Sequence, residues 1–215
     1  MVDLPEIVPI FPLPDHVLLP FLPTPYRLFE PAPVAMAQAL LEKDRGKRWI
    51  VVPRLEPVVD GEVGDSAPIA ELAVAACVHQ LLPLAGDQYL MLAEGRARVR
   101  LTEAESDLAY RLAWVTLAPD EEDSEGDLDP SEVLRLATLL VGREGGANLT
   151  VGGLTADRPD PAVLSWRVAG AYLRDADHRQ EILGLASARA RLERLEELLT
   201  TMLKRSARRN GGPPE

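Results

Sequence analysis

The sequence predicts an α+β protein in which a small barrel of short antiparallel strands is followed by a bundle of helices. From Glu6 to about Leu117, apolar residues alternate with polar ones and turn residues recur every few positions, which is typical of such strands. Beyond an acidic run the apolar residues recur at three-and-four spacing, as they do in helices. With 215 residues, of which 47% are hydrophobic and 27% charged, the chain can bury a substantial core.

The first strands are predicted at IVPIF and VLLP, residues 7–11 and 17–20. The next segment, PVAMAQALLEK, predicts a short helix with Pro33 tolerated in its first turn. Its expected buried face consists of Met36, Ala37, Leu40 and Leu41. WIVVP, residues 49–53, follows as a compact buried strand, and LEPVVDGEVGDSAP predicts a mobile loop.

The next segment, IAELAVAACVHQLLPL, is predicted to form one long strand or a bent pair of strands. After the turn AGDQ, strands are predicted at YLMLAEG and RARVRL. In RARVRL, Ala97, Val99 and Leu101 predict a buried face. The opposite face is predicted to be basic and solvent-exposed, with Arg96, Arg98 and Arg100. YRLAWVTL also alternates strictly, with Tyr110, Leu112 and Trp114 on one face and Arg111, Ala113 and Val115 on the other. Many short strands with one early helix favour a closed or half-closed barrel, because closure removes exposed sheet edges.

The helical part begins after the acidic run APDEEDSEGDLDP. Asp129, Pro130 and Glu132 predict a capped helix with the stripe Val133, Leu136, Ala137 and Leu140, and Asp160 with Pro161 predicts a second. GREGGANLTVGGL is expected to be a flexible connector. The last helices are predicted from about Asp177, with a restart at Ser187 and a stripe of Leu192, Leu195, Leu199 and Met202. The predicted organisation is a barrel (1–118), an acidic linker (119–129), a helical subdomain (130–208) and a disordered tail (209–215).

Charge and cysteine content exclude several classes of function. A formal net charge of −11 repels nucleic-acid phosphate, so no nucleic-acid partner is expected. The single cysteine, Cys77, cannot form an internal disulfide, which suits a reducing cytosol. No uninterrupted apolar run reaches 18 residues, and the acidic, proline-cut start is a poor export signal, so we expect a cytoplasmic protein without a membrane span.

No convincing catalytic centre is predicted, and neither cofactor nor metal is expected. Gly64-Asp65-Ser66 and Asp175-Ala176-Asp177-His178 resemble blocks of the GDSL esterases, with Ser66 as nucleophile and His178 as base. Ser66 is expected in a loop between strands, however, and His178 in a first helical turn after an Asp177 cap, so this esterase stays a remote alternative. Cys77 and His79 would share one face of a strand, but His16 and His178 are isolated. A buried thiol beside a hydrogen-bonded histidine is the favoured interpretation.

One long run nevertheless resembles a known family. VPIFPLPDHVLLPFLPTPYRLFEP is similar to the opening of the Lon N-terminal, substrate-binding domain family, LPLFPLPxxVLFPGxxLPLxIFEPRY. The matching residues are Ile10, Phe11, Pro12, Leu13, Pro14, Val17, Leu18, Pro20, Pro25, Leu28, Phe29, Glu30 and Pro31. The hairpin continues the match at Gly86, Tyr89, Leu90, Leu92, Glu94, Gly95, Arg98 and Val99. The chain departs from the pattern at Ala32 and Pro33, where the family has Arg-Tyr, and at Leu72 and Ala73, where it has Val-Gly.

The resemblance implies a PUA-like pseudo-barrel followed by a helical bundle, acting as a stand-alone, non-enzymatic protein-recognition module without ATPase or peptidase modules. Its implied partners are unfolded or misfolded proteins or a protease system, in protein quality control. Candidate contact residues are Phe21, Leu22 and Tyr26, which are also candidates for the buried core. A small-ligand or modified-base binder on the same fold, using the basic face, is the alternative. The oligomeric state is left open.

Overall fold

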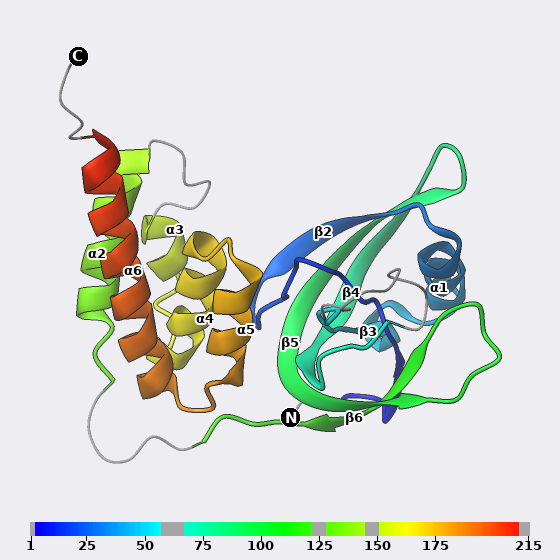
Figure 1. Ribbon diagram of the computed structural model, residues 1–215. Coiled ribbons are helices and arrows are strands. Elements are labelled where there is room, and N and C mark those ends of the chain that lie inside the picture. The colour runs from blue at the N-terminus through cyan, green and yellow to red at the C-terminus, as the bar shows by residue number, and fades with distance from the viewer. Residues whose placement is uncertain (1–2, 57–66, 122–127, 145–150, 211–215) are drawn as a thin grey trace. The chain divides into compact units, whose positions relative to one another are not determined.

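The computed structural model describes residues 3–56, 67–121, 128–144 and 151–210, and the chain divides into two compact units, Met1–Pro119 and Asp120–Glu215. The described strands all lie in the first unit, and the second unit is helical (Figure 1). Within the described ranges, no helix is both long and apolar enough to cross a membrane.

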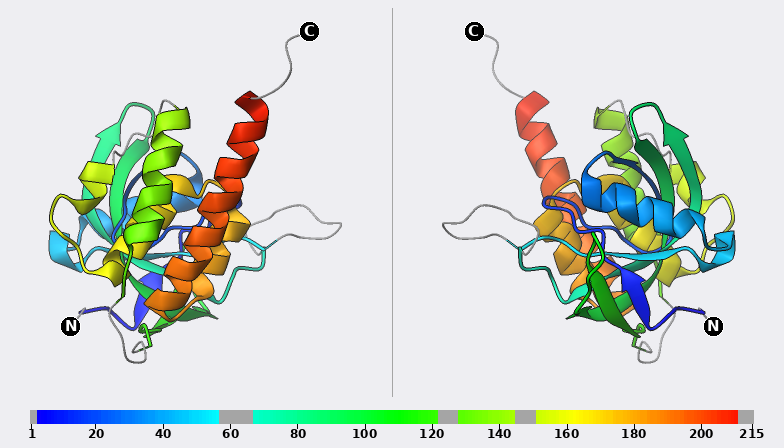
Figure 2. Two further views of the ribbon diagram at one scale, coloured as in Figure 1. Left: turned by 90° about the vertical axis from the view of Figure 1, so that its left-hand side faces the viewer. Right: turned by 90° about the vertical axis from the view of Figure 1, so that its right-hand side faces the viewer.

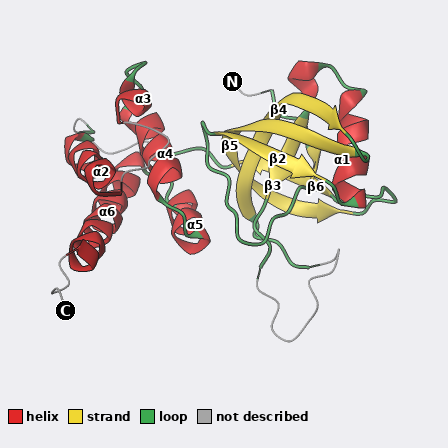
Figure 3. Ribbon diagram, turned by 90° about the horizontal axis from the view of Figure 1, so that it is seen from above, coloured by secondary structure: helices red, strands yellow, loops and turns green. Residues whose placement is uncertain are grey.

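The first unit is a curled six-stranded sheet that closes on itself. Its strands are β1 (Ile7–Pro9), β2 (Pro23–Leu28), β3 (Trp49–Val52), β4 (Leu72–Leu84), β5 (Gln88–Ala104) and β6 (Leu112–Leu117). They pair antiparallel in the order β1-β6-β5-β4-β3, and β2 pairs with β5 beside this path. Figure 3 shows the strands gathered into one curled sheet beside the helix at residues 31–41, labelled α1. Parallel bridges from Ile10 to Val51 and from Leu13 to Arg54 join the two ends of the order. The predicted barrel and α+β class are therefore confirmed.

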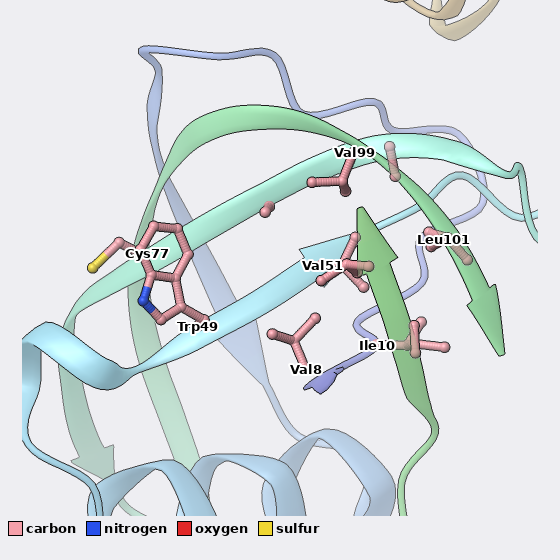
Figure 4. Packing of buried hydrophobic residues seen from close by; sticks show 11 residues of the cluster. Val8, Ile10, Trp49, Val51, Cys77, Val99 and Leu101 are labelled. Atoms are coloured by element: carbon pink, nitrogen blue, oxygen red, sulfur yellow. The ribbon is translucent and has the colours of Figure 1, made fainter. Parts of the chain in front are cut away.

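A cluster of buried apolar side chains fills one side of this sheet (Figure 4). Trp49 and Cys77 lie opposite each other on β3 and β4, and Val8 and Ile10 come from the first strand segment. On β6 the predicted alternation holds: Ala113 and Val115 are buried, whereas Trp114 between them is 49% exposed. The period of two thus places these residues on opposite faces of β6, and the structure shows that the face with Ala113 and Val115 is the buried one.

Helix α1 (Pro31–Leu41) is the predicted early helix, and it begins at Pro31, two residues before Pro33. Met36, Ala37 and Leu40 are buried as predicted. The prediction for Leu41 is wrong, since this side chain is 38% exposed. Leu41 is the last helical residue and is followed by exposed residues from Glu42 to Lys47, so nothing covers it from that side.

The predicted strand at residues 17–20 is absent, although Val17, Leu18 and Leu19 are buried. This segment instead passes closely over β5, where a Cβ atom built on Gly95 would lie 2.4 Å from the carbonyl oxygen of Leu19. The Phe21 N–H donates to the Gly95 carbonyl over 2.8 Å. Pro20 has no N–H to donate to a ladder, so the chain packs here without pairing as a strand.

The second unit contains α2 (Ser131–Glu144), α3 (Val151–Thr155), α4 (Pro161–Tyr172), α5 (Ala176–Gly184) and α6 (Ala188–Asn210). α2 and α6 pack side by side (Figure 2). The predicted stripes are confirmed for α2 and for the three leucines of α6, all of which are buried. The predicted starts are also confirmed: Asp129 accepts a hydrogen bond from the Ser131 N–H, and Asp160 accepts one from the Ala162 N–H.

Three details of the helical prediction need correction. The cap of α5 is Asp175, whose carboxylate accepts from the His178 N–H over 3.0 Å, and not Asp177. The expected connector ends in the short helix α3, because Leu154 is buried there and holds it to the unit. Finally, α6 continues to Asn210, so residues 209 and 210 belong to a helix and not to a tail.

A fully buried arginine organises the second unit. Arg191 of α6 is 0% exposed, and its guanidinium donates to Asp120 over 2.6 Å and to the Ser165 hydroxyl over 3.0 Å. It also donates to the carbonyls of Leu185 and Ala186 and lies 4.0 Å from the Trp166 ring centroid. Asp120, expected in the acidic linker, is thereby bound to the helices. Hydrogen bonding and pairing of this kind compensate the cost of burying a charge.

Candidate functional site

The barrel unit carries an open cleft with a volume of about 970 Å³. Three segments far apart in the sequence line it: residues 10–14 of the proline-rich stretch, the start of α1, and residues 103–111, which connect β5 to β6. Leu55, just after β3, completes the lining. A cleft of this size lies at the upper end of the range for ligand sites in proteins, so it is the strongest candidate for a binding site.

Residues 10–14, called the floor of the cleft below, are held in an extended form. The Phe11 N–H donates to the Val51 carbonyl over 2.8 Å, and the Leu13 N–H donates to the Pro53 carbonyl over 3.1 Å. Pro12 and Pro14 alternate with these donors and need no partner of their own. Sequence and hydrogen bonding together therefore give a rigid apolar floor, which a ligand can contact without ordering it first.

Behind this floor lies an aromatic cluster. The Phe11 ring meets the Tyr26 ring edge-on, with centroids 5.2 Å apart, and the Tyr26 hydroxyl is 3.0 Å from Nε2 of His16. Edge-to-face packing of this kind stabilises aromatic pairs beyond the burial of their area. The cluster therefore packs Phe11, which lines the cleft, against Tyr26, which does not line it.

One arginine anchors the β5–β6 connection. Arg111 binds Glu103 through two hydrogen bonds of 2.6 Å each, and it donates to the Ala67 carbonyl over 3.0 Å. The guanidinium lowers the pKa of the Glu103 carboxyl, chiefly through the hydrogen bonds. This fork holds the side of the cleft that residues 105–110 form.

The exposed charged side chains that line the cleft, called its rim below, are mainly acidic. Of the charged residues that line it, Glu30, Glu103, Glu105 and Asp107 are acids and Arg111 is the base. Glu103 is paired with that base, whereas Glu30, Glu105 and Asp107 are exposed and form no ion pair within the described part of the chain. Leu108, which is 53% exposed, stands among them. The cleft therefore combines an apolar floor with an uncompensated negative rim.

The three contact residues predicted from the sequence do not line this cleft. Tyr26 is 8% exposed and belongs to the aromatic cluster behind it, so its ring is packed by its own protein. Phe21 and Leu22 are half-buried, and Phe21 has a φ angle of 61°, a left-handed conformation that is uncommon for a bulky residue. Phe21 and Leu22 remain predicted contact residues of a separate surface.

The sequence did not indicate the residues that shape the cleft most, those between Glu103 and Arg111. The available signal was a short acidic segment with one leucine between two alternating strands. Two residues at which the chain departs from the Lon pattern, Ala32 and Pro33, do line the cleft. The small, uncharged pair leaves the acidic rim uncompensated on that side.

The predicted basic face needs correction at Arg98. This side chain is 6% exposed, and its guanidinium donates to the Pro119 carbonyl over 2.9 Å. Arg96 interacts with Glu94 at 3.3 Å, and Arg100 is exposed. Arg98 stays on the face opposite Val99 and Leu101, but the segment after β6 bonds to it there: besides the guanidinium bond to Pro119, the Ala118 N–H donates to the Arg98 carbonyl over 2.9 Å. Three aligned cations for an anionic ligand are therefore not formed.

The candidate residues for other chemistry have local roles. Cys77 is buried, and burial raises the pKa of its thiol. His79 is 2.7 Å from Glu94, which agrees with the interpretation of a buried thiol and a hydrogen-bonded histidine. His178 lies in the first turn of α5, and Ser66 lies outside the described residues. Among the residues that the structure describes, no group of three or more His, Cys, Asp or Glu side chains could hold a metal ion.

Two curated proteins are similar to most of this chain. Lon protease 2 of Herpetosiphon aurantiacus is 25% identical over 199 residues, which cover 90% of this chain and 23% of that protein. Lon protease of Koribacter versatilis is 27% identical over 209 residues, which cover 94% of this chain and 25% of that protein. The chain thus spans about a quarter of the length of the curated relatives it matches.

Solved structures share the fold. The N-terminal domain of Mycobacterium avium complex Lon protease has a TM-score of 0.67 and 19% identity, covering 91% of this chain and 98% of that one. A Lon N-terminal domain protein from Xanthomonas campestris has a TM-score of 0.60 and 23% identity, and the match covers 88% of this chain and 96% of that one. A family model, described as the ATP-dependent protease La (LON) substrate-binding domain, matches residues 7–201. The resemblance found in the sequence is thereby confirmed, and the chain belongs to the family of Lon substrate-binding domains.

Proposed function

We propose that this protein is a non-enzymatic recognition module that binds exposed apolar segments of other proteins and presents them to a proteolytic system. The observation that carries the proposal is the open cleft of about 970 Å³ with its rigid apolar floor, in a chain of the Lon substrate-binding family. Apolar floors with a few polar groups at the rim are typical of sites that take up ligands from water.

The edge of the sheet at β2 limits how a partner segment could bind to the barrel unit. β2 is an edge strand whose one partner among the described strands is β5, and Pro23 and Pro25 remove two of its N–H groups. Prolines on an edge prevent the pairing of a further strand. A partner segment would therefore bind through side chains in the cleft rather than by extending the sheet.

The alternative of a small-ligand or modified-base binder receives less support, above all for ligands that carry phosphate. Phosphate would meet the carboxylates of Glu30, Glu105 and Asp107 at the rim, and like charges repel. The predicted basic face, its only support in the sequence, is interrupted by the burial of Arg98.

Capture of an unfolded protein by the immobilised full chain tests the proposal. Reduced and alkylated α-lactalbumin should be retained, and the native protein at the same concentration should not. Leu108→Asn should weaken retention about fivefold or more, the effect of truncating an apolar contact worth about 1 kcal/mol. Leu84→Asn is the matched control, because Leu84 is 40% exposed and lies outside the cleft. Equal retention of native and unfolded protein, or equal effects of both substitutions, would contradict the proposal.

A further inference from the structure

The cleft offers a partner two kinds of contact close together. Pro12, Pro14, Leu55 and Leu108 supply apolar surface, and three carboxylates without an ion-pair partner in the described ranges stand at the rim. Glu30 comes from the residue before α1, whereas Glu105 and Asp107 come from the β5–β6 connection. The negative charge is thus contributed by two separate segments of the cleft wall.

A purely apolar segment would not match this arrangement. Closing the cleft with apolar side chains would take water from the carboxylates and give no hydrogen bond in return, which is unfavourable. Lys and Arg fit both features, because their aliphatic stems pack on apolar surface while the charged ends remain at the rim. Charge complementarity therefore identifies the chemistry of the occupant.

We propose that the cleft selects extended protein segments in which Lys or Arg stands beside apolar residues. This inference rests on the proposed function and narrows it to a class of segment. It assigns apolar contact to the floor and discrimination to Glu30, Glu105 and Asp107. Glu103 has a different role, since its carboxylate is already bound by Arg111 and holds the wall in place.

The selection is expected to be moderate and sensitive to salt. Pairs between exposed charges are individually weak, and ionic strength screens them. Three such pairs together should favour a Lys-bearing segment over its Glu-bearing counterpart about tenfold at low salt. That preference should shrink as salt is added, while the apolar part of the binding persists.

Three labelled synthetic peptides of equal length and the full chain provide the test, with fluorescence anisotropy as the readout. The first peptide places three Lys among leucines, the second replaces each Lys by Glu, and the third keeps the Lys but replaces the leucines by Ser. The first should bind about tenfold more tightly than the second at low salt. It should also bind more tightly than the third, which measures attraction by charge alone.

Matched variants locate the effect. Glu30→Gln, Glu105→Gln and Asp107→Asn combined should abolish the preference for Lys over Glu. A control that removes the same three charges elsewhere on the barrel unit, Glu6→Gln, Glu71→Gln and Asp87→Asn, should keep it, because these exposed residues lie outside the cleft. Since all six side chains are exposed, both variants are expected to fold.

The outcomes separate this inference from the broader function. If the first two peptides bind equally tightly, or if both variants lose the preference equally, charge selection by the cleft is wrong while protein recognition stands. If the third peptide binds as tightly as the first, the rim attracts cations without regard to apolar groups, and the inference is again wrong. If none of the peptides and no unfolded protein binds, the proposed function itself fails.

Discussion

In the helical unit the most deeply placed charge is Arg191, which is fully buried and bound by a carboxylate, a hydroxyl and two carbonyls. In the barrel unit the cleft carboxylates of Glu30, Glu105 and Asp107 are exposed and form no ion pair within the described residues. Charges with fixed partners stabilise a fold, and charges left at a cleft rim are available to a ligand. The difference indicates that the helical unit uses its central charge for stability, whereas the rim charges of the barrel unit are free for the recognition that we propose.

The largest expected effect on stability comes from removing the buried charge of the helical unit. Arg191→Met should lower the free energy of unfolding by about 3–5 kcal/mol, because it removes four hydrogen bonds from the interior of the unit, those to Asp120, to the Ser165 hydroxyl and to two carbonyls. Urea unfolding followed by circular dichroism at 222 nm measures the loss. Arg135→Met is the control, because its i,i+3 pair with Glu132 is exposed and its loss should leave stability nearly unchanged. Similar losses for both variants would refute the central role of Arg191.

A smaller effect is expected where the barrel packs most closely. Gly95→Ala places a Cβ atom 2.4 Å from the Leu19 carbonyl oxygen, so backbone must shift. We expect a loss of about 1–3 kcal/mol, the usual range for overpacking. Gly46→Ala has nothing within 4 Å of its new Cβ atom and should be nearly neutral. Urea unfolding monitored by tryptophan fluorescence compares the two, and a neutral Gly95→Ala would contradict the packing of residues 17–20 on β5.

The Glu103–Arg111 fork should give a smaller and pH-dependent effect. The pKa of Glu103 is lowered in the folded protein, so the ion pair stabilises the fold above the ordinary carboxyl pKa and loses its contribution as the pH falls through the folded value. Because the Glu103 side chain is 46% exposed, its contribution should be below about 1 kcal/mol. Glu103→Gln should therefore be less stable than the wild type at pH 7, and the two should converge as the pH falls below the lowered pKa of Glu103. A difference that grows on acidification would be inconsistent with the pair.

The smallest effect on stability is expected at the rim. Combining Glu105→Gln with Asp107→Asn should change the free energy of unfolding by less than about 0.5 kcal/mol, since these exposed carboxylates have no ion-pair partner within the described ranges. Thermal unfolding of the variant and the wild type in one buffer is the measurement. A clear loss of stability would show that these charges support the fold, and the contrast between the units would no longer hold.

Local patterns in the sequence were sufficient for much of the fold. The alternation in β6 identified one face with Ala113 and Val115, which the structure buries, and three-and-four spacing predicted the buried leucines of α6. Both features depend on residues close together in the chain, where periodicity determines which residues share one face of an element.

Features that depend on distant segments were missed. Arg98 was predicted to be exposed because its partners, Ala118 and Pro119, lie outside the local pattern. Arg191 stands in a strongly charged helix, and its burial requires Asp120 and Ser165 from elsewhere in the chain. The cleft joins residues 10–14, the start of α1 and residues 103–111, so no single stretch of sequence indicates it.

Hydrogen exchange of the full chain, with and without saturating reduced and alkylated α-lactalbumin, tests most directly whether the cleft is the recognition site. The β4–β5 hairpin is the internal comparison, because Leu82, Leu84 and Leu90 are exposed there but lie outside the cleft. The account predicts slower exchange at residues 103–111 on binding and unchanged exchange at residues 82–90. Slower exchange at residues 82–90 with no change at residues 103–111 would contradict it.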